Sequence, residues 1–386
     1  MGMDQSPSAR LDFLKTCLET DPNNLHLIED TIGAAVAAKQ LLVAAELLEH
    51  RATLAPLSPE LLNLSGQIAL ETNQLAKAIA IFQSLSLQDP ENLVFRLNQA
   101  WALYYDHQLE SASALLNDEI VTGFASGSLL KSRLLHLESR FEEALEVASQ
   151  GLERHPNDRN LLGISSVLAM DLDDQDLAYS TAILAGDNCE ALTTLAILEI
   201  RDGHIKAASE KLAKVAEREP FSARAALGQG MVSMLENNLP EAIKHLKRGA
   251  QLFKTHAGSW VALGWAELLA GNQSEAEVVF RKALELDRTF AETHGSIAVI
   301  EALKGNSEAS QHAALTARRL DPQSFAAMLA NVLVHASRGE KEMADHIFKQ
   351  ALSTPVDTEG RTLTSLIANM TDLFPKNTLK FNLYQN

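Results

Sequence analysis

The sequence predicts an all-α, right-handed superhelical solenoid of antiparallel helix pairs, and three periodic features support this prediction. A small residue recurs at intervals of 34, 34, 32, 34, 30, 34, 34, 34 and 34 residues. These residues are Ala44, Ala78, Ala112, Ala144, Ala178, Ala208, Ala242, Ala276, Ser310 and Ala344. Proline follows five of them after twelve residues, at Pro56, Pro90, Pro156, Pro220 and Pro322. Helix-breaking residues recur on the same period at Gly203, Asn237, Gly271, Gly305 and Gly339. A fixed period of this length is typical of stacked supersecondary units.

The composition of the chain agrees with a long, thin helical core. Hydrophobic residues make up 46% of the 386 residues, and only 5% are aromatic. Acidic residues outnumber basic ones by 50 to 33, which gives a net charge of −17 and argues against nucleic acid as a partner. No apolar run reaches the roughly 18 residues of a membrane span. The two cysteines, Cys17 and Cys189, do not suggest a disulfide framework, so we expect a cytoplasmic location.

Each period predicts two helices, as residues 258–288 illustrate. Apolar residues follow helical spacing in the first helix, and Gly271 and Asn272 then end it. The second helix is expected over residues 274–286, with Ser274 as its N-cap. The recurring small residue, Ala276 in this period, is expected where the two helices cross, because a larger side chain would hold the backbones apart. The recurring helix breaks are expected at positions that need a positive φ.

The residues of this period strongly resemble the tetratricopeptide repeat. The resemblance rests on Trp260-Val-Ala-Leu263-Gly264 followed by Ala276, Phe280 and Ala283. Similar runs are Ala78-Ile-Ala-Ile-Phe82 with Pro90, and Ala344 with Phe348 and Ala351. The resemblance covers about residues 25–356 and implies ten repeats whose first helices line a concave, protein-binding face.

The pattern divides the chain into four predicted segments. These are a leader with a lone first helix (1–24), an N-terminal arm of four repeats (25–158), a C-terminal arm of six repeats (159–358), and an amphipathic capping helix with a tail (359–386). In the middle of the chain the period shortens twice, from Ala112 to Ala144 and from Ala178 to Ala208, and residues 122–128 are expected to be flexible. The capping helix is predicted from an apolar stripe that runs from Leu363 to Phe374. Alternatively, this helix detaches and fills a groove.

The resemblance also implies which side chains face a ligand, because the second, fifth, ninth, twelfth and thirteenth places of the first helix line the family's groove. In the last four repeats these places are mostly apolar, which predicts a groove for an apolar partner. The alternative is that the same residues are core, or are buried by tight winding of the chain. The predicted groove residues are Trp101, Tyr104, Tyr105, Leu227, Met231, Met234, Leu235, Val261, Trp265, Leu268, Leu269, Val299, Leu303, Leu329 and Leu333.

No constellation in the sequence predicts catalysis, a cofactor or a metal site. The chain has no GxxxxGK[ST], HExxH or CxxC motif. The acidic stretch from Asp171 to Asp176 lacks the glycine and glutamate of a calcium loop and is interpreted as a solvated turn. The Lys-Asn pair of the family's peptide-carboxylate clamp is also missing.

The sequence therefore predicts a non-catalytic protein-interaction scaffold, or a chaperone-like adaptor. Its concave groove is expected to bind an apolar or amphipathic helical segment of a partner protein or peptide. The alternative is a structural protein that assembles into homo-oligomers, and an enzyme is the third possibility.

Overall fold

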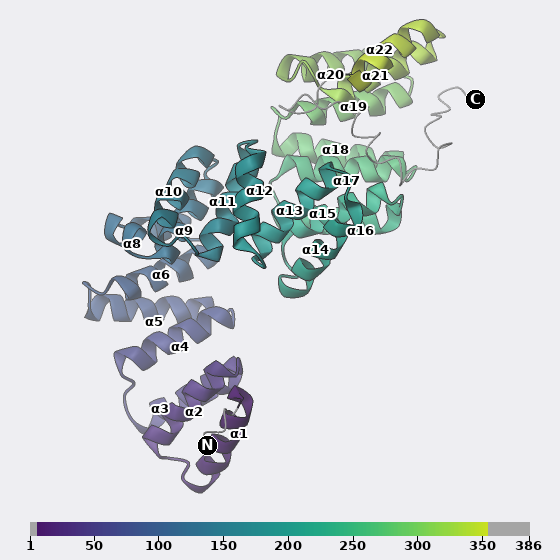
Figure 1. Cartoon of the computed structure of the whole chain (residues 1–386). Coiled ribbons are helices and arrows are strands. Elements are labelled where there is room, and N and C mark those ends of the chain that lie inside the picture. Colours follow the sequence, from purple (N-terminus) through teal and green to yellow (C-terminus); the bar gives the residue numbers. More distant parts are fainter. Residues whose placement is uncertain (1–5, 354–386) are drawn as a thin grey trace. The chain divides into compact units, whose positions relative to one another are not determined.

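The computed structural model describes residues 6–353, and within them every regular element is a helix. The predicted all-α solenoid of antiparallel helix pairs is confirmed (Figure 1). The chain divides into two compact units, residues 1–164 and 165–386, and the boundary falls within α11 (Arg159–Asp171). The predicted boundary between residues 158 and 159 lies at the start of this helix. The predicted capping helix and tail, residues 359–386, lie outside the described residues.

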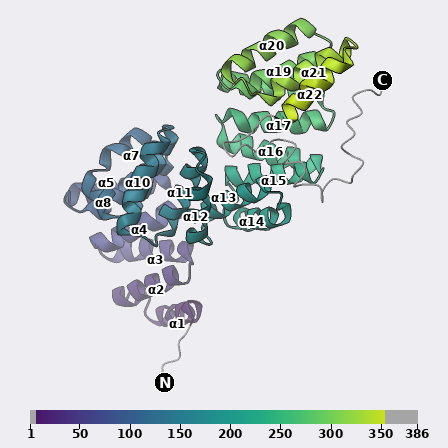
Figure 2. The same cartoon turned by 45° about the horizontal axis from the view of Figure 1, so that its top comes forward.

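The first unit opens with the lone leading helix that the sequence predicts, and paired helices follow it (Figure 2). Its helices before α11 are α1 (Pro7–Thr20), α2 (Leu25–Ala37), α3 (Leu41–Leu54), α4 (Pro59–Glu71), α5 (Leu75–Gln88), α6 (Leu93–Tyr105), α7 (Leu109–Leu115), α8 (Asp118–Gly123), α9 (Ala125–Leu137) and α10 (Phe141–Arg154).

The second unit continues the same alternation of first and second helices. Its helices after α11 are α12 (Gln175–Ala185), α13 (Cys189–Arg201), α14 (Ile205–Arg218), α15 (Ala223–Leu235), α16 (Leu239–Phe253), α17 (Ala257–Leu269), α18 (Gln273–Leu286), α19 (Ala291–Leu303), α20 (Ser307–Leu320), α21 (Phe325–Ser337) and α22 (Lys341–Ser353).

The helix breaks take the positive φ that the sequence predicts. Gly203, Asn237, Gly271, Gly305 and Gly339 have φ between 57° and 85°. The same place in the first five repeats is filled by residues that the sequence did not single out, all with φ near 60°: Lys39, Asn73, His107, Ser139 and Asp173. The next N–H then bonds five residues back, as from Asn272 to the carbonyl of Glu267 at 2.9 Å. This bond satisfies a carbonyl of the last helical turn.

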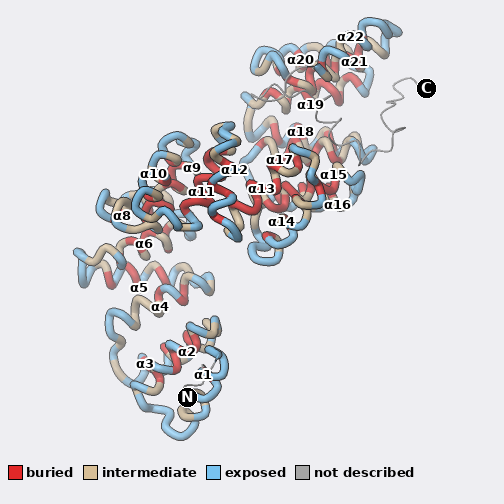
Figure 3. The backbone as a smooth tube through the Cα atoms, viewed as in Figure 1, coloured by how far each residue is buried: buried red, intermediate tan, exposed pale blue. Residues whose placement is uncertain are grey.

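The ten recurring small residues are all buried, none more than 2% exposed, as expected for helix crossings. Their repeats also bring glycine against an aromatic ring. A Cβ on Gly264 would lie 2.3 Å from Cε1 of Phe280, and a Cβ on Gly66 would lie 2.6 Å from Cε1 of Phe82. In Figure 3 the buried residues lie along the helix sides that face neighbouring helices, and exposed residues lie at the turns and on the outward sides of the helices. The core therefore combines alanine with leucine, isoleucine and valine side chains, and a glycine makes room for a phenylalanine ring at these two places.

Two local predictions are wrong. Residues 122–128 are not a flexible stretch, because they form the end of α8 and the start of α9. Close packing explains their small side chains: a Cβ on Gly127 would lie 2.2 Å from the carbonyl oxygen of Ile120, and Ser128 Oγ donates to the carbonyl of Val121 at 2.6 Å. Ser274 is not an N-cap, because the N-cap of α18 is Asn272, whose side chain makes no capping hydrogen bond.

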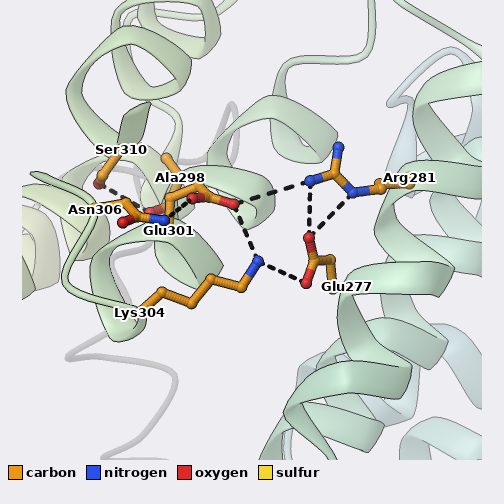
Figure 4. A network of polar contacts seen from close by, with 7 residues as sticks. All are labelled: Glu277, Arg281, Ala298, Glu301, Lys304, Asn306 and Ser310. Atoms are coloured by element: carbon orange, nitrogen blue, oxygen red, sulfur yellow. Dashed lines mark hydrogen bonds and ion pairs between the residues drawn. The ribbon is translucent and has the colours of Figure 1, made fainter. Parts of the chain in front are cut away.

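A polar network joins α18 to the next repeat (Figure 4). Lys304 Nζ lies 2.6 Å from Glu277 Oε2 and 3.3 Å from Glu301 Oε1. Arg281 lies 2.7 Å from the other oxygen of Glu277, and Asn306 Nδ2 donates to Glu301 Oε2 at 2.8 Å. These bonds lower the pKa of Glu277 and raise that of Lys304, so both remain charged at neutral pH. The network therefore links α18 to the C-terminal end of α19.

A histidine begins α17 and makes the stability of this helix sensitive to pH. Nδ1 of His256 accepts the N–H of Ser259 at 3.1 Å, so the ring caps the helix only while Nδ1 carries no proton. Burial against Phe253 lowers the pKa of His256 below 6.5, and Arg224 lowers it further. A depressed histidine pKa means that the unfolded chain binds the proton more readily. The cap therefore stabilises the fold fully above pH 6.5 and is lost as the pH falls through the folded-state pKa.

We expect His256→Asn to retain the cap and to remove this part of the pH dependence, because asparagine is a good N-cap at any pH. When the pH is lowered from 7.5 to 5, the free energy of unfolding of the wild type should fall by about 1 kcal/mol more than that of the variant. This is the typical contribution of an N-cap. Urea unfolding at both pH values measures this difference. Parallel pH profiles for the two proteins would contradict the assignment.

Candidate functional site

The predicted groove residues of the first unit form an aromatic cluster on α6. The ring centroids of Trp101 and Tyr104 lie 5.7 Å apart at 84°, and those of Trp101 and Tyr105 lie 5.7 Å apart at 28°. Tyr105 is 50% exposed, while Trp101 and Tyr104 pack partly against the core around Leu103 and Leu134. Edge-on and stacked contacts of this kind hold the rings in fixed positions. The cluster thus presents a preorganised aromatic surface.

The predicted groove residues of the second unit differ in exposure. Val261 and Val299 are buried, with only 7% and 2% of their surface exposed, so they could contribute to a groove only as its floor. Leu269 and Leu303 are exposed at 57% and 47%. The remaining residues are partly buried, with one side against the core: Leu227, Met231, Met234, Leu235, Trp265, Leu268, Leu329 and Leu333.

Trp265 serves the core as well as the predicted surface. Its ring meets Phe280 edge-on, with centroids 5.9 Å apart at 67°, and it packs on two adjacent core clusters. Trp260 is core, as the sequence predicts: it is 7% exposed, its Nε1 donates to the carbonyl of Lys254, and Lys282 lies 3.6 Å above its ring. Because replacing Trp265 would also disturb the core, other residues are better probes of binding.

An apolar cavity opens among the first helices of three consecutive repeats in the second unit. Its volume is 420 Å³, and α11, α13 and α15 supply its lining. The lining residues are Met170, Ile197, Leu198, Ile200, Arg201, Met231, Met234 and Leu235. Arg201 is the only one with a charge. The cavity has the size and apolar lining of sites that bind ligand side chains or small molecules.

Three predicted groove residues, Met231, Met234 and Leu235, lie together in this cavity. The sequence prediction missed the facing residues Ile197, Ile200 and Met170, although the periodic register contains them. Ile197 lies eleven residues before Ala208, just as Met231 lies eleven before Ala242. Ile200 and Met170 each lie eight residues before Ala208 and Ala178, as Met234 does before Ala242. Applying the same offsets to the fifth and sixth repeats would have found them.

The charged groups beside the cavity are unevenly paired. Asp171, next to Met170, accepts two hydrogen bonds from Arg224 Nη2, at 2.7 and 2.9 Å, and so links α11 to α15. Glu199 Oε1 lies 2.6 Å from Lys211 Nζ. Arg201 Nε donates to Asp202 at 3.2 Å, but Nη1 of Arg201 is buried and has no hydrogen-bond partner. Oε2 of Glu199 is likewise buried without a hydrogen-bond partner, so one atom of each of these two charged groups is left unpaired.

The described residues offer little for catalysis or metal binding. Among residues 6–353, no three His, Cys, Asp or Glu side chains are grouped so that they could hold a metal ion. Burial and, to a smaller extent, Glu219 raise the pKa of the Cys189 thiol to about 11, so the thiol stays protonated at neutral pH. No helix in this part of the chain has the length and apolar character needed to cross a bilayer.

Comparison with known proteins agrees with the helix pairs. Residues 193–257 and residues 257–290 each match a family model described as a tetratricopeptide repeat. No curated protein matches the sequence. Among solved structures, the human IFIT1 dimer with PPP-AAAA is similar at 14% identity and a TM-score of 0.51, over 91% of this chain and 95% of that one.

Two further structures are similar at the same low identity. A monomeric IFIT1 mutant with a capped AAAA RNA matches at 14% identity and a TM-score of 0.51, over 85% of this chain and 90% of that one. The APC/C hetero-tetramer Cut9–Hcn1 matches at 14% identity and a TM-score of 0.45, over 95% of this chain and 85% of that one. At this identity the likeness to IFIT1 shows the fold alone. From its family matches and its helix pairs, the chain is a tetratricopeptide repeat protein.

Proposed function

We propose that this chain is a non-catalytic scaffold that binds an apolar or amphipathic helical segment of a partner protein. The segment would lie on the first helices of the second unit. The observation that carries this proposal is the 420 Å³ cavity, because it is lined by apolar side chains from α11, α13 and α15. Partly exposed apolar residues continue on the next first helices, with Leu268 and Leu269 on α17 and Leu303 on α19.

The side chains of the cavity suit a helical ligand. A helix presents large apolar residues at i, i+3, i+4 and i+7, which match a groove formed by successive parallel first helices. Methionines supply three of the eight lining positions, and their flexible side chains adapt to ligand side chains of different shape. A chaperone-like role, in which several apolar segments are bound in turn, would use the same adaptability.

A nucleic acid is not proposed as the ligand. IFIT1 holds PPP-AAAA in its own structure, whereas this chain carries a net charge of −17. Neutralising RNA phosphates needs clustered Lys and Arg, and the cavity has one charged residue, Arg201.

Affinity capture of partners tests the proposal, with the intact wild-type chain and the Met234→Lys variant used as baits in parallel. A partner that binds through the cavity should be recovered by the wild type and lost with the variant. Crosslinks from the partner should fall on α13 and α15. Partners recovered equally by both proteins would show that binding takes place elsewhere.

A second candidate function, self-assembly, is favoured by the outer face of α12. Tyr179, Ile183 and Leu184 are exposed at 56%, 52% and 68% within one short helix. Three large apolar side chains so close together are unusual on the surface of a monomer.

If α12 mediates self-assembly, the mass measured by light scattering should rise with protein concentration, and Ile183→Glu should hold it at the monomer value. Val278→Glu is the matched control, because Val278 is an exposed apolar residue, at 68%, on α18. A monomeric wild type at all concentrations would dismiss this candidate.

A further inference from the structure

The chain carries a ligand of its own for the apolar cavity. Residues 354–386 follow α22 and lie outside the described part of the structure. Six large apolar residues recur there at helical spacing, just before Pro375: Leu363, Leu366, Ile367, Met370, Leu373 and Phe374. The opposite side of the same helical wheel carries Ser365, Ala368 and Asp372. This is the i, i+3, i+4, i+7 pattern with which a helix binds an apolar groove.

The apolar cavity suits this stripe better than the hollow at the last repeat does. Seven of the eight residues that line the cavity are apolar. The last repeat has a hollow of 490 Å³, but its lining includes Glu340, Lys341 and Glu342. Apolar side chains placed there would strip water from three charged groups without offering them a partner. In the cavity the same side chains would displace water from apolar walls.

The connecting chain is long enough for the stripe to reach the cavity. Nine residues, 354–362, join α22 to the stripe, and a chain of this length spans at most about 30 Å. Packed helices lie about 8–10 Å apart, so the two steps from α19 to α15 take roughly 16–20 Å. A helix over residues 363–374 would be about 17 Å long. The helix would therefore extend across three consecutive first helices, and the connection would cover the step from the last repeat to α19.

The first helices offer a continuous apolar surface along this path, and they succeed one another along the second unit (Figure 1). Met234 on α15 and Trp265 on α17 pack on the same core cluster. Trp265 packs on the next cluster as well, together with Leu333 on α21. The exposed Leu269 and Leu303 lie on α17 and α19. A segment that arrives from α22 would meet α19 first and the cavity last.

We propose that residues 363–374 bind as a helix in this groove of their own chain and compete there with a partner segment. Leu363 would lie over Leu303 on α19, and Phe374 would fill the cavity beside Met234. The segment would thus be an autoinhibitory ligand. The docking goes beyond the proposed function, whereas the competition rests on it. A partner that binds more tightly would hold the groove for a larger share of the time, so it would still add protection to α13 and α15.

A photocrosslinker at the end of the stripe tests the docking on the full chain. Benzoylphenylalanine in place of Phe374 keeps an aromatic side chain there, and mass spectrometry of the digested monomer maps the crosslinks. We expect them on α13 and α15, at residues such as Ile197 and Met231. Crosslinks on α21 or α22 would identify a capping helix and overturn the proposal. Crosslinks found only in a covalent dimer would place the segment on a second copy and overturn it equally.

A pair of double variants tests the same docking without a crosslinker. Met370→Asp with Phe374→Asp puts charge on the apolar stripe, so it should release the segment and speed hydrogen exchange in α13 and α15. Ser365→Asp with Ala368→Asp is the matched control, because it adds the same charge on the opposite side of the helix. It should leave exchange as in the wild type. Faster exchange confined to α21 and α22 in the first variant would again indicate a cap.

The competition is measured with a partner captured by the wild type. Deleting residues 359–386 should strengthen its binding about tenfold, the gain expected if the segment occupies the groove for roughly nine-tenths of the time. Unchanged affinity would overturn the competition. The proposed function has a separate readout: crosslinks on α15, together with partners that are indifferent to Met234→Lys, would uphold the docking and overturn the proposed function instead.

Discussion

Replacing Phe280 by alanine is expected to lower the free energy of unfolding by about 3–5 kcal/mol. Phe280 is fully buried, lies against Gly264 and meets the ring of Trp265 edge-on. Removing the ring would leave a cavity in a closely packed cluster, and such a cavity adds to the lost transfer free energy of the side chain. Urea unfolding followed by circular dichroism measures the loss. Phe348, two periods later on α22, is the matched control.

The control should respond less because Phe348 is only partly buried, whereas its counterpart is fully enclosed. Gly264→Ala supplies a further test, since its new Cβ would lie 2.3 Å from the Phe280 ring. Alone it should cost about 1–3 kcal/mol through overpacking. Combined with Phe280→Ala it should cost almost nothing more, because the clash is gone. Additive losses would contradict the direct contact.

Met234→Lys is expected to weaken partner binding by at least about 2 kcal/mol, or roughly thirtyfold. Met234 lines the cavity and is partly buried, so a helix seated there would contact its side chain. Lysine keeps a similar aliphatic stem but places an ammonium group where the ligand is apolar. Its charge can still reach water in the free chain, so we expect stability to change by less than about 1 kcal/mol.

Met343→Lys is the matched control for this prediction. Met343 lies on α22, a second helix, and is 50% exposed. The same change of side chain there should leave binding intact. Calorimetric titration of both variants with a partner captured by the wild type measures the difference. Equal affinities for the two variants would contradict a binding site at the cavity.

The fold could be predicted almost completely from the sequence, because its determinants repeat. Each small residue, such as Ala276, lies at a helix crossing, and each break, such as Gly271, lies five residues earlier with a positive φ. Periodicity gives such positions ten times over. The insertion of α8 could not be predicted, because nothing repeats there. The order of residues 122–128 depends on the contact of Gly127 with a backbone carbonyl of α8.

The candidate site was less accessible to sequence reasoning, because helix register does not fix exposure. Val261 and Leu269 were both assigned to the groove, yet one is buried and the other is exposed. The difference arises from the packing of α17 against its neighbours. The environment of Arg201 was likewise invisible, since an unsatisfied Nη1 is a property of three-dimensional contacts. The groove residues as a set remain a prediction that binding experiments must test.

Hydrogen exchange of the full chain, with and without a captured partner, tests the central claim most directly. The claim is that the first helices of the second unit bind a partner segment at the apolar cavity. We expect protection to increase in peptides covering α13 and α15, with little change in the second helices α16 and α18. Protection confined to the second helices, or to the aromatic cluster on α6, would contradict the claim.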